Sequence, residues 1–246
     1  MILALAVLLA TMSSSDAVVC LLNAPTSCGK KAYAEAMAVV ERDAKAGKPL
    51  QQFVLGVTRT DDPKLAEKYL DASRGRIYEM AEKTNNPMAW YLMSVEKNDV
   101  ACLQKAADGG NVQALNALGT LILSEAMARR NADTNQLEVS FRKCFKCFQQ
   151  AARQKDPNGF VNLGTCFLRG FGCKQDMKAA VRCYEAAAAL GHPEAMDNLS
   201  AAYQLGHGVE ADSEKSLVWA VRARALRGDH AAEEWLRERL TRKGEL

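Results

Sequence analysis

Apolar residues recur at helical spacing along most of the chain, and one stretch of this pattern is written twice. The segment NLGTCFLRGFGCKQD, which starts at Asn162, is echoed by NLSAAYQLGHGVEAD, which starts at Asn198. Around the first copy Phe160, Leu163, Gly164 and Phe167 follow i, i+3, i+4 and i+7, the period of one helical face, and Ala195, Leu199 and Tyr203 form a similar face one repeat later. The two copies start 36 residues apart, and a fixed repeat of this length is typical of stacked helix pairs. The pattern therefore predicts an all-α fold built from antiparallel helix pairs.

Small and polar residues mark where each predicted helix ends. Gly-Phe-Gly in the first copy and Gly-His-Gly in the second can supply the positive φ angles that end a helix. Asp176 and Asp212 stand where they would cap the second helix by accepting its unpaired N–H groups. Gly164 and Ser200 follow the leucine of each copy, and a small side chain there would let the second helix approach closely.

These residues resemble the Sel-1-like repeat, a relative of the tetratricopeptide repeat. The resemblance is strongest from Ala195 to Asp212, whereas Ser200 departs from the family's glycine and Cys173 from its valine. It covers residues 111–228, and residues 30–242 loosely. It implies a right-handed α-solenoid of about five repeats, two of them regular. It also implies that interaction and assembly are the common role, with no catalytic residues to transfer.

The remaining helices are predicted from the same periodicity. Extra residues between Ser124 and Asn135 make the preceding repeat too long, so that a helix is extended there or a loop protrudes. The amphipathic segment Asp229–Arg242 is suited to cover the last apolar face of a repeat array. The other predicted helices are 30–46, 50–57, 63–83, 86–94 and a segment starting by 99.

The N-terminal segment is apolar in a way that predicts a signal peptide. Residues 2–10 are uncharged and aliphatic, too short to span a membrane, and small residues follow. We expect cleavage after Ala17, although no basic residue precedes the apolar run. Lipidation of Cys20 is disfavoured, because Val19 is large where a lipoprotein signal has a small residue. The predicted organisation is a signal peptide at 1–17, an N-terminal segment at 18–29, and a repeat array with a capping helix at 30–246.

Export would place the eight cysteines in an oxidising compartment, the periplasm or the extracellular space. Cys20 and Cys28 flank a short loop and are expected to pair, unless both are free or Cys20 leaves with the leader. The last four residues, KGEL, resemble an endoplasmic-reticulum retrieval signal. The alternative compartment, in a eukaryote, is therefore the endoplasmic-reticulum lumen, with a quality-control adaptor as a further functional hypothesis.

Cys144 and Cys147 form the one motif suggestive of catalysis. A redox C-x-x-C needs a strand-to-helix turn that lowers one thiol pKa, whereas this motif lies within a helical pattern. Cys102, Cys147 and Cys183 share one repeat position, which favours packing. A zinc site at Cys144 and Cys147 would need a second pair of ligands, and no such pair stands at a suitable spacing. Two of Cys166, Cys173 and Cys183 could form a disulfide that links the helices of one hairpin. We predict no catalytic residue, cofactor or metal.

The leading hypothesis is an exported scaffold that binds a protein or peptide on the concave face lined by the first helices. The alternative is a thiol-disulfide oxidoreductase or another enzyme on the same scaffold. Because the net charge is only +3, we predict no nucleic-acid partner. We also predict no stable membrane insertion after removal of the leader. The oligomeric state stays open. Changes at Asn116, Asn158 and Asp197 are expected to weaken capture without altering the melting temperature. By analogy with tetratricopeptide grooves the candidate contacts are Tyr91, Gln113, Asn116, Thr120, Asn158, Thr165, Glu194, Asp197 and Gln204.

Overall fold

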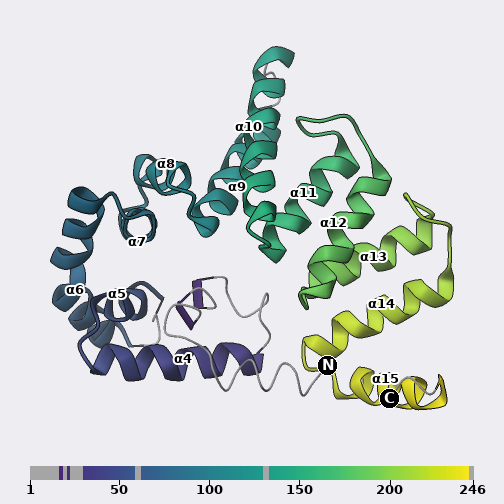
Figure 1. Ribbon diagram of the computed structural model, residues 1–246, viewed down its shortest axis with the longest axis horizontal. Coiled ribbons are helices and arrows are strands. Elements are labelled where there is room, and N and C mark those ends of the chain that lie inside the picture. The colour runs from purple at the N-terminus through teal and green to yellow at the C-terminus, as the bar shows by residue number, and fades with distance from the viewer. Residues whose placement is uncertain (1–16, 19–20, 23–29, 59–61, 130–132, 244–246) are drawn as a thin grey trace. The chain divides into compact units, whose positions relative to one another are not determined.

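The protein is helical throughout the part that the structure describes. A computed structural model describes residues 17–18, 21–22, 30–58, 62–129 and 133–243, and no strand occurs among them (Figure 1). The all-α fold of helix pairs predicted from the sequence is confirmed. The chain divides into two compact units, one up to Ala114 and one from Leu115 onward.

The first unit contains helices of 9 to 22 residues joined by tight connections, and three of these helices start with proline. Asp62, Asn86 and Asp99 each cap the helix that follows by accepting a backbone N–H group. The helices of this unit whose bounds lie among the described residues are α4 (Lys30–Lys45), α5 (Pro49–Thr58), α6 (Pro63–Thr84), α7 (Pro87–Lys97) and α8 (Val100–Asp108). Their bounds agree with the predicted segments to within a few residues.

The second unit contains the regular repeats. Figure 1 shows α11 and α12, then α13 and α14, as two successive antiparallel hairpins. The last helix follows α14 and packs against it, as expected of a capping helix. The helices, counting the one that begins just before Leu115, are α9 (Val112–Ala128), α10 (Thr134–Arg153), α11 (Pro157–Arg169), α12 (Met177–Ala189), α13 (Pro193–Leu205), α14 (Ser213–Leu226) and α15 (His230–Lys243).

The residues singled out in the two copies perform the expected local roles. Asp176 and Asp212 accept backbone N–H groups at the start of α12 and α14. Within the first repeat, a Cβ added to Gly164 would lie 2.6 Å from a ring carbon of Tyr184, so α11 and α12 cross where only glycine fits. In the second repeat the hydroxyls of Ser200 and Ser216 hydrogen-bond at 3.0 Å instead.

The turn of each repeat packs on the repeat before it. Gly172 has a φ of +68°, and a Cβ there would lie 2.3 Å from the Phe141 carbonyl oxygen on α10. Gly208 has a φ of +77° and meets the Met177 carbonyl of α12 at the same distance. The two glycines therefore dock equivalent turns onto equivalent positions of successive second helices.

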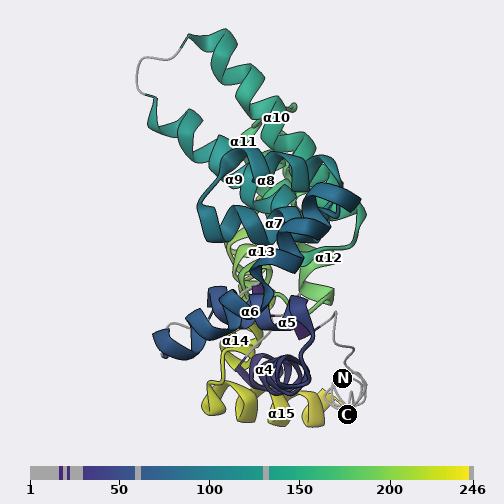
Figure 2. The same ribbon diagram turned by 90° about the vertical axis from the view of Figure 1, so that its left-hand side faces the viewer.

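The repeat that has extra residues between Ser124 and Asn135 contains longer helices than the two regular repeats. α9 has 17 residues and α10 has 20, whereas α11, α12 and α13 have 13 each. Figure 2 shows α9 and α10 running beyond α11. Of the two options left open by the sequence, helix extension occurs, and residues 130–132 between these helices lie outside the described residues.

Two clusters of buried side chains hold the second unit together. One joins α11, α12 and α13 through residues such as Tyr184, Met196 and Leu199. The other joins α10 and α11 through Phe148, Leu163 and two fully buried cysteines. Alanine is the commonest residue of the first cluster, whereas phenylalanine side chains surround the second.

Residues 1–16 of the predicted signal peptide and most of the segment up to residue 29 lie outside the described residues, as do Cys20, Cys28 and residues 244–246 of the KGEL tail. The division into leader, segment and repeat array therefore stays a prediction. Among the described helices, none combines the length and apolar character that crossing a membrane requires.

Candidate binding groove

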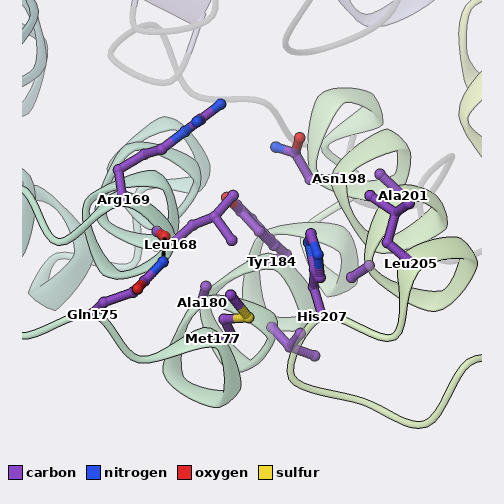
Figure 3. Close-up of a pocket in the computed structure, with 12 residues that line it drawn as sticks. Leu168, Arg169, Gln175, Met177, Ala180, Tyr184, Asn198, Ala201, Leu205 and His207 are labelled. Carbon is purple, nitrogen blue, oxygen red and sulfur yellow. Dashed lines mark hydrogen bonds between the residues drawn. The ribbon is translucent and has the colours of Figure 1, made fainter.

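A groove of about 450 Å³ opens in the second unit between the first helices of the two regular repeats. Its walls are the end of α11 and one face of α13, and its floor is the first half of α12 (Figure 3). This volume is within the range of sites that bind small molecules or anchor side chains. The lining residues are Leu168, Arg169, Gln175, Met177, Ala180, Val181, Tyr184, Asn198, Ala201, Ala202, Leu205 and His207.

The floor of the groove is apolar and rigid. Ala180, Val181 and Tyr184 belong to the buried core of α12, and the alanine leaves open the space that a larger side chain would fill. The Tyr184 hydroxyl lies 3.4 Å from Thr165 Oγ1, and burial raises the Tyr184 pKa. Tyr184 therefore stays a neutral phenol at physiological pH and presents an uncharged surface.

The rim of the groove carries three polar side chains. Among the described residues, no hydrogen bond or ion pair engages the Arg169 guanidinium, the Asn198 amide or the His207 ring. Figure 3 shows Arg169 and Asn198 on opposite sides, with Tyr184 between them. Polar groups without protein partners next to an apolar floor can orient a ligand by hydrogen bonds and charge. Arg169, the charged member, suits a carboxylate.

The turn between α11 and α12 shapes one wall of the groove. Gln175 Nε2 donates a hydrogen bond to the Leu168 carbonyl oxygen at 2.8 Å, which ties the turn back to the end of α11. Gly170 ends α11 with a φ of +73°, a left-handed conformation that glycine adopts without strain. The groove is thus preformed by the framework of the repeat.

Comparison with known proteins places this framework in a family. Four successive segments, residues 100–111, 113–156, 161–192 and 193–226, match the Sel1 repeat. The chain belongs to the Sel1 repeat family. Sel1 repeats build helical scaffolds that typically mediate protein interactions. The last two segments coincide with the helix pairs α11–α12 and α13–α14, which the sequence identified as the regular repeats.

Two solved structures are similar to this Sel1 repeat chain. A Sel1 repeat protein from Oxalobacter formigenes shares 24% identity with a TM-score of 0.44, over 52% of this chain and 90% of that protein. A protective antigen of uropathogenic Escherichia coli strains, described as displaying an SLR fold, shares 20% identity with a TM-score of 0.48. That match covers 82% of this chain, and this chain spans only 45% of that protein.

The nine partner-contact candidates lie elsewhere than the lining of this groove. Tyr91 and Gln113 were expected to face outward, and this expectation is wrong, because they are only 9% and 7% exposed. Tyr91 lies in the apolar first-unit helix α7, five of whose neighbouring side chains are also buried. Side chains enclosed in this way cannot form an open surface.

Three other candidates form contacts between helices: Asn116 and Asn158 connect neighbouring repeats, whereas Asp197 contacts the C-cap residue of α14 in its own repeat. Asn116 Nδ2 donates a hydrogen bond to Asp156 Oδ2 at 2.8 Å, so α9 is tied to the cap of α11. His192 Nε2 donates to Asn158 Oδ1 at 3.0 Å, so α11 is tied to the start of α13. Asp197 forms an ion pair with Arg227. Because of these contacts we now expect changes at Asn116 and Asn158 to lower the melting temperature, whereas the exposed Asp197 pair should contribute little.

The remaining candidates are one internal residue and three exposed ones. The Thr165 hydroxyl donates to the Val161 carbonyl oxygen at 3.1 Å beneath the groove. Thr120, Glu194 and Gln204 are exposed, and whether they contact a partner stays a prediction. Gln204 directly precedes Leu205, which lines the groove. On α13 the groove is thus lined by Asn198 and Leu205, each one position after a predicted partner contact, Asp197 and Gln204.

The inter-repeat contacts leave two buried polar atoms without a hydrogen-bond partner among the described residues, Asn116 Oδ1 and His192 Nδ1. His192 occupies the N-cap position of α13 but makes no side-chain capping bond, unlike Asp156 at α11. Burial lowers the His192 pKa, although Glu194 and Asp156 oppose this shift. The neutral ring is therefore the form that the fold favours.

The C-x-x-C motif lies in the middle of α10, where no helix N-terminus can stabilise a thiolate. Cys144 is 0% exposed and packs with Cys166, whose pKa is raised by its hydrogen bond to Cys144 and by burial. Burial likewise raises the pKa of Cys183 to about 11. The thiolate is therefore disfavoured at Cys166 and Cys183. At Cys144 the hydrogen bond with Cys166 lowers the pKa although burial opposes this shift, but its fully buried side chain is closed to the partner thiol or disulfide that exchange requires. The packing role predicted for the shared cysteine position holds for Cys102, which is buried, and in part for Cys183.

No disulfide joins the described cysteines Cys102, Cys144, Cys147, Cys166, Cys173 and Cys183. The hairpin staple that the sequence allowed is thus not formed between Cys166, Cys173 and Cys183; instead Cys173 Sγ donates to the Cys166 carbonyl oxygen at 3.5 Å. Within the described ranges, no group of three or more His, Cys, Asp or Glu side chains is arranged to hold a metal ion.

Proposed function

We propose that this Sel1 repeat chain is a scaffold that captures a short segment of a partner protein in the groove between α11 and α13. The observation that carries the proposal is the preformed 450 Å³ groove with an apolar floor and unengaged polar groups on its rim. Grooves of this composition bind an apolar side chain and orient the backbone beside it. The framework of the repeat forms the walls, so binding requires little reorganisation.

The lining indicates the chemistry of the bound segment. Met177, Val181 and Leu205 offer aliphatic contacts, and Leu205 is 62% exposed, which leaves apolar area to be covered. Asn198 can donate to and accept from a peptide backbone. Arg169 favours a carboxylate near the aliphatic anchor. The proposed ligand is therefore a segment in which an aliphatic side chain stands close to an acidic group.

The proposal can be tested by filling the groove. A displayed library of random 12-residue peptides would be selected on the full chain, and binding of the enriched peptides measured against Ala201→Trp. Ala201 lines the groove and is exposed, so the indole should occupy the ligand space without disturbing the core. We expect affinity to fall at least about tenfold, the loss of one buried aliphatic anchor.

Gln204→Trp is the matched control, because Gln204 is exposed on the same helix and does not line the groove. The proposal predicts unchanged binding in this variant. Loss of binding in Gln204→Trp with retention in Ala201→Trp would instead favour the surface first expected from the sequence. A further variant, Arg169→Glu, should reduce binding of those peptides that carry a carboxylate.

We also propose that the chain is exported, to the periplasm or the extracellular space, or to the endoplasmic-reticulum lumen in a eukaryote. The support is the apolar run at residues 2–10 followed by small residues. N-terminal sequencing of the protein recovered from its host should begin at Val18. A protein that retains Met1 and fractionates with cytosolic markers would contradict export.

A further inference from the structure

Positive charge is concentrated in one part of the second unit. From Arg142 to Arg182 the sequence contains nine lysine and arginine residues and only two acidic residues, Asp156 and Asp176. Both aspartates accept backbone N–H groups as helix caps, at 2.7 Å and 2.9 Å. Both carboxylates are thus occupied as helix caps, and nine cations against two carboxylates leave this segment with a net charge of +7.

Four of these basic side chains occupy equivalent positions on successive second helices. Arg142 and Lys146 are one turn apart on α10, and Lys178 and Arg182 are one turn apart on α12. All four are exposed. Equivalence follows from the turn contacts, because a Cβ on Gly172 would meet Arg142 N and one on Gly208 would meet Lys178 N. The four side chains therefore point the same way; we call them the basic face.

The two helices that carry the basic face lie close together. The Phe171 ring, in the turn before α12, stacks on Phe141 of α10 with centroids 4.6 Å apart. Cys183 of α12 packs against the same buried cluster as Cys144 and Phe148 of α10. The charges thus form two short parallel rows on one surface.

Internal ion pairs do little to neutralise this surface. Among the described residues only Arg142 of the four is paired, with Glu138 on the same helix. Such an exposed pair is weak and exchangeable. Lys178 lies at the start of α12, where a cation opposes the helix dipole, whereas the equivalent residue of the next repeat is Glu214. Helix stability therefore gives no reason for lysine at this position.

We propose that the basic face docks a short acidic segment of a partner protein, independently of the groove. Glu138 and Glu185 stand at opposite ends of the rows, both exposed. They would repel a longer polyanion, such as a nucleic acid or an anionic membrane, that continued past the four cations. A segment with a few carboxylates fits between these borders, and two rows of side chains one helical turn apart can each meet carboxylates of such a segment.

The test measures fluorescence anisotropy of a labelled 12-residue peptide that alternates Asp or Glu with Gly or Ser. The titrant is the full chain, either wild type or carrying Lys146→Glu and Arg182→Glu together. Charge reversal at both rows should weaken binding by roughly tenfold or more. Wild-type binding should also decline as salt is raised, because exposed charges are screened. The neutral pair Lys146→Gln and Arg182→Gln should lie between the two.

The matched control reverses two exposed cations of the first unit, Lys64→Glu and Arg76→Glu, with the same change in net charge. The proposal predicts near-wild-type binding there, and unchanged circular-dichroism melting in every variant used. An equal loss in this control, or no binding of the acidic peptide at all, would overturn it. Tighter binding of a 12-base-pair duplex or of phosphatidylserine vesicles than of the peptide would overturn the assignment to a protein segment.

Discussion

The two regular repeats share a framework but differ in the side chains that they expose. Both use glycine to dock the turn, at Gly172 and Gly208, and aspartate to start the second helix. They differ at Lys178 against Glu214, at the equivalent position of the second helix. Residues that both repeats share therefore build the stack, whereas residues that change from one repeat to the next give each junction its own surface chemistry.

The largest effect is expected where the shared framework is tightest. Gly172→Ala should destabilise the chain by about 3 kcal/mol, because the residue combines a positive φ with a Cβ position 2.3 Å from the Phe141 carbonyl oxygen. Gly170→Ala is the control, since its φ of +73° is similar but its nearest neighbour is 3.5 Å away. It should cost only about 1–2 kcal/mol. Urea unfolding measures both, and equal losses would show that turn docking contributes nothing beyond backbone strain.

A smaller effect is expected at polar contacts between helices. Asn158→Ala removes the partner of His192 Nε2 and leaves a buried ring without hydrogen bonds, at a cost of about 2 kcal/mol. Asp197→Ala removes an exposed ion pair and should cost less than about 1 kcal/mol. Thermal melts of the two variants decide the order. A larger loss in Asp197→Ala would contradict the assignment of Asn158 as the internal connection.

The smallest effect is expected in the pH dependence of stability, through His192 at the start of the second regular repeat. Burial lowers the His192 pKa below its ordinary value of 6.5, so the unfolded chain takes up this proton more readily than the folded chain. The histidine's contribution to stability is therefore complete above pH 6.5 and declines as the pH falls below it. Nearby Asp156 and Glu194 oppose the shift, and Arg227 reinforces it.

The matched variant for this measurement is His192→Asn, because asparagine caps α7 and α9 through Asn86 and Asn111. Unfolding free energies of wild type and variant would be compared from pH 7 to pH 5. We expect the wild type to lose more stability than the variant over this range. Parallel curves would mean that His192 does not titrate differently in the folded and unfolded chain.

The framework was predictable from the sequence because its signals are local. Periodicity located the helices, and Asp176 and Asp212 took the capping roles that their positions indicated. The extension of α9 and α10 was left open because the sequence between them suits either a longer helix or a loop. Register along the chain thus carried most of the fold.

The groove was not predictable in the same way, because it depends on the rotation of each helix about its axis. A shift of one residue turns a side chain by about 100°. Asp197 was therefore predicted as a partner contact, whereas its neighbour Asn198 lines the groove and Asp197 pairs with Arg227. Tyr91 was also misassigned, since polar character alone cannot tell whether a neighbouring helix covers it. The repeated asparagine at 162 and 198 was the available signal.

The most direct test of groove binding is a methyl NMR titration of the full chain with the best selected peptide. The methyl groups of Leu168, Met177, Val181 and Leu205 line the groove, whereas Leu217 is exposed on α14 outside it. The account predicts shift changes and intermolecular contacts at the first four and none at Leu217. Changes at Leu217 or in the first unit, with the groove methyls unaffected, would contradict it.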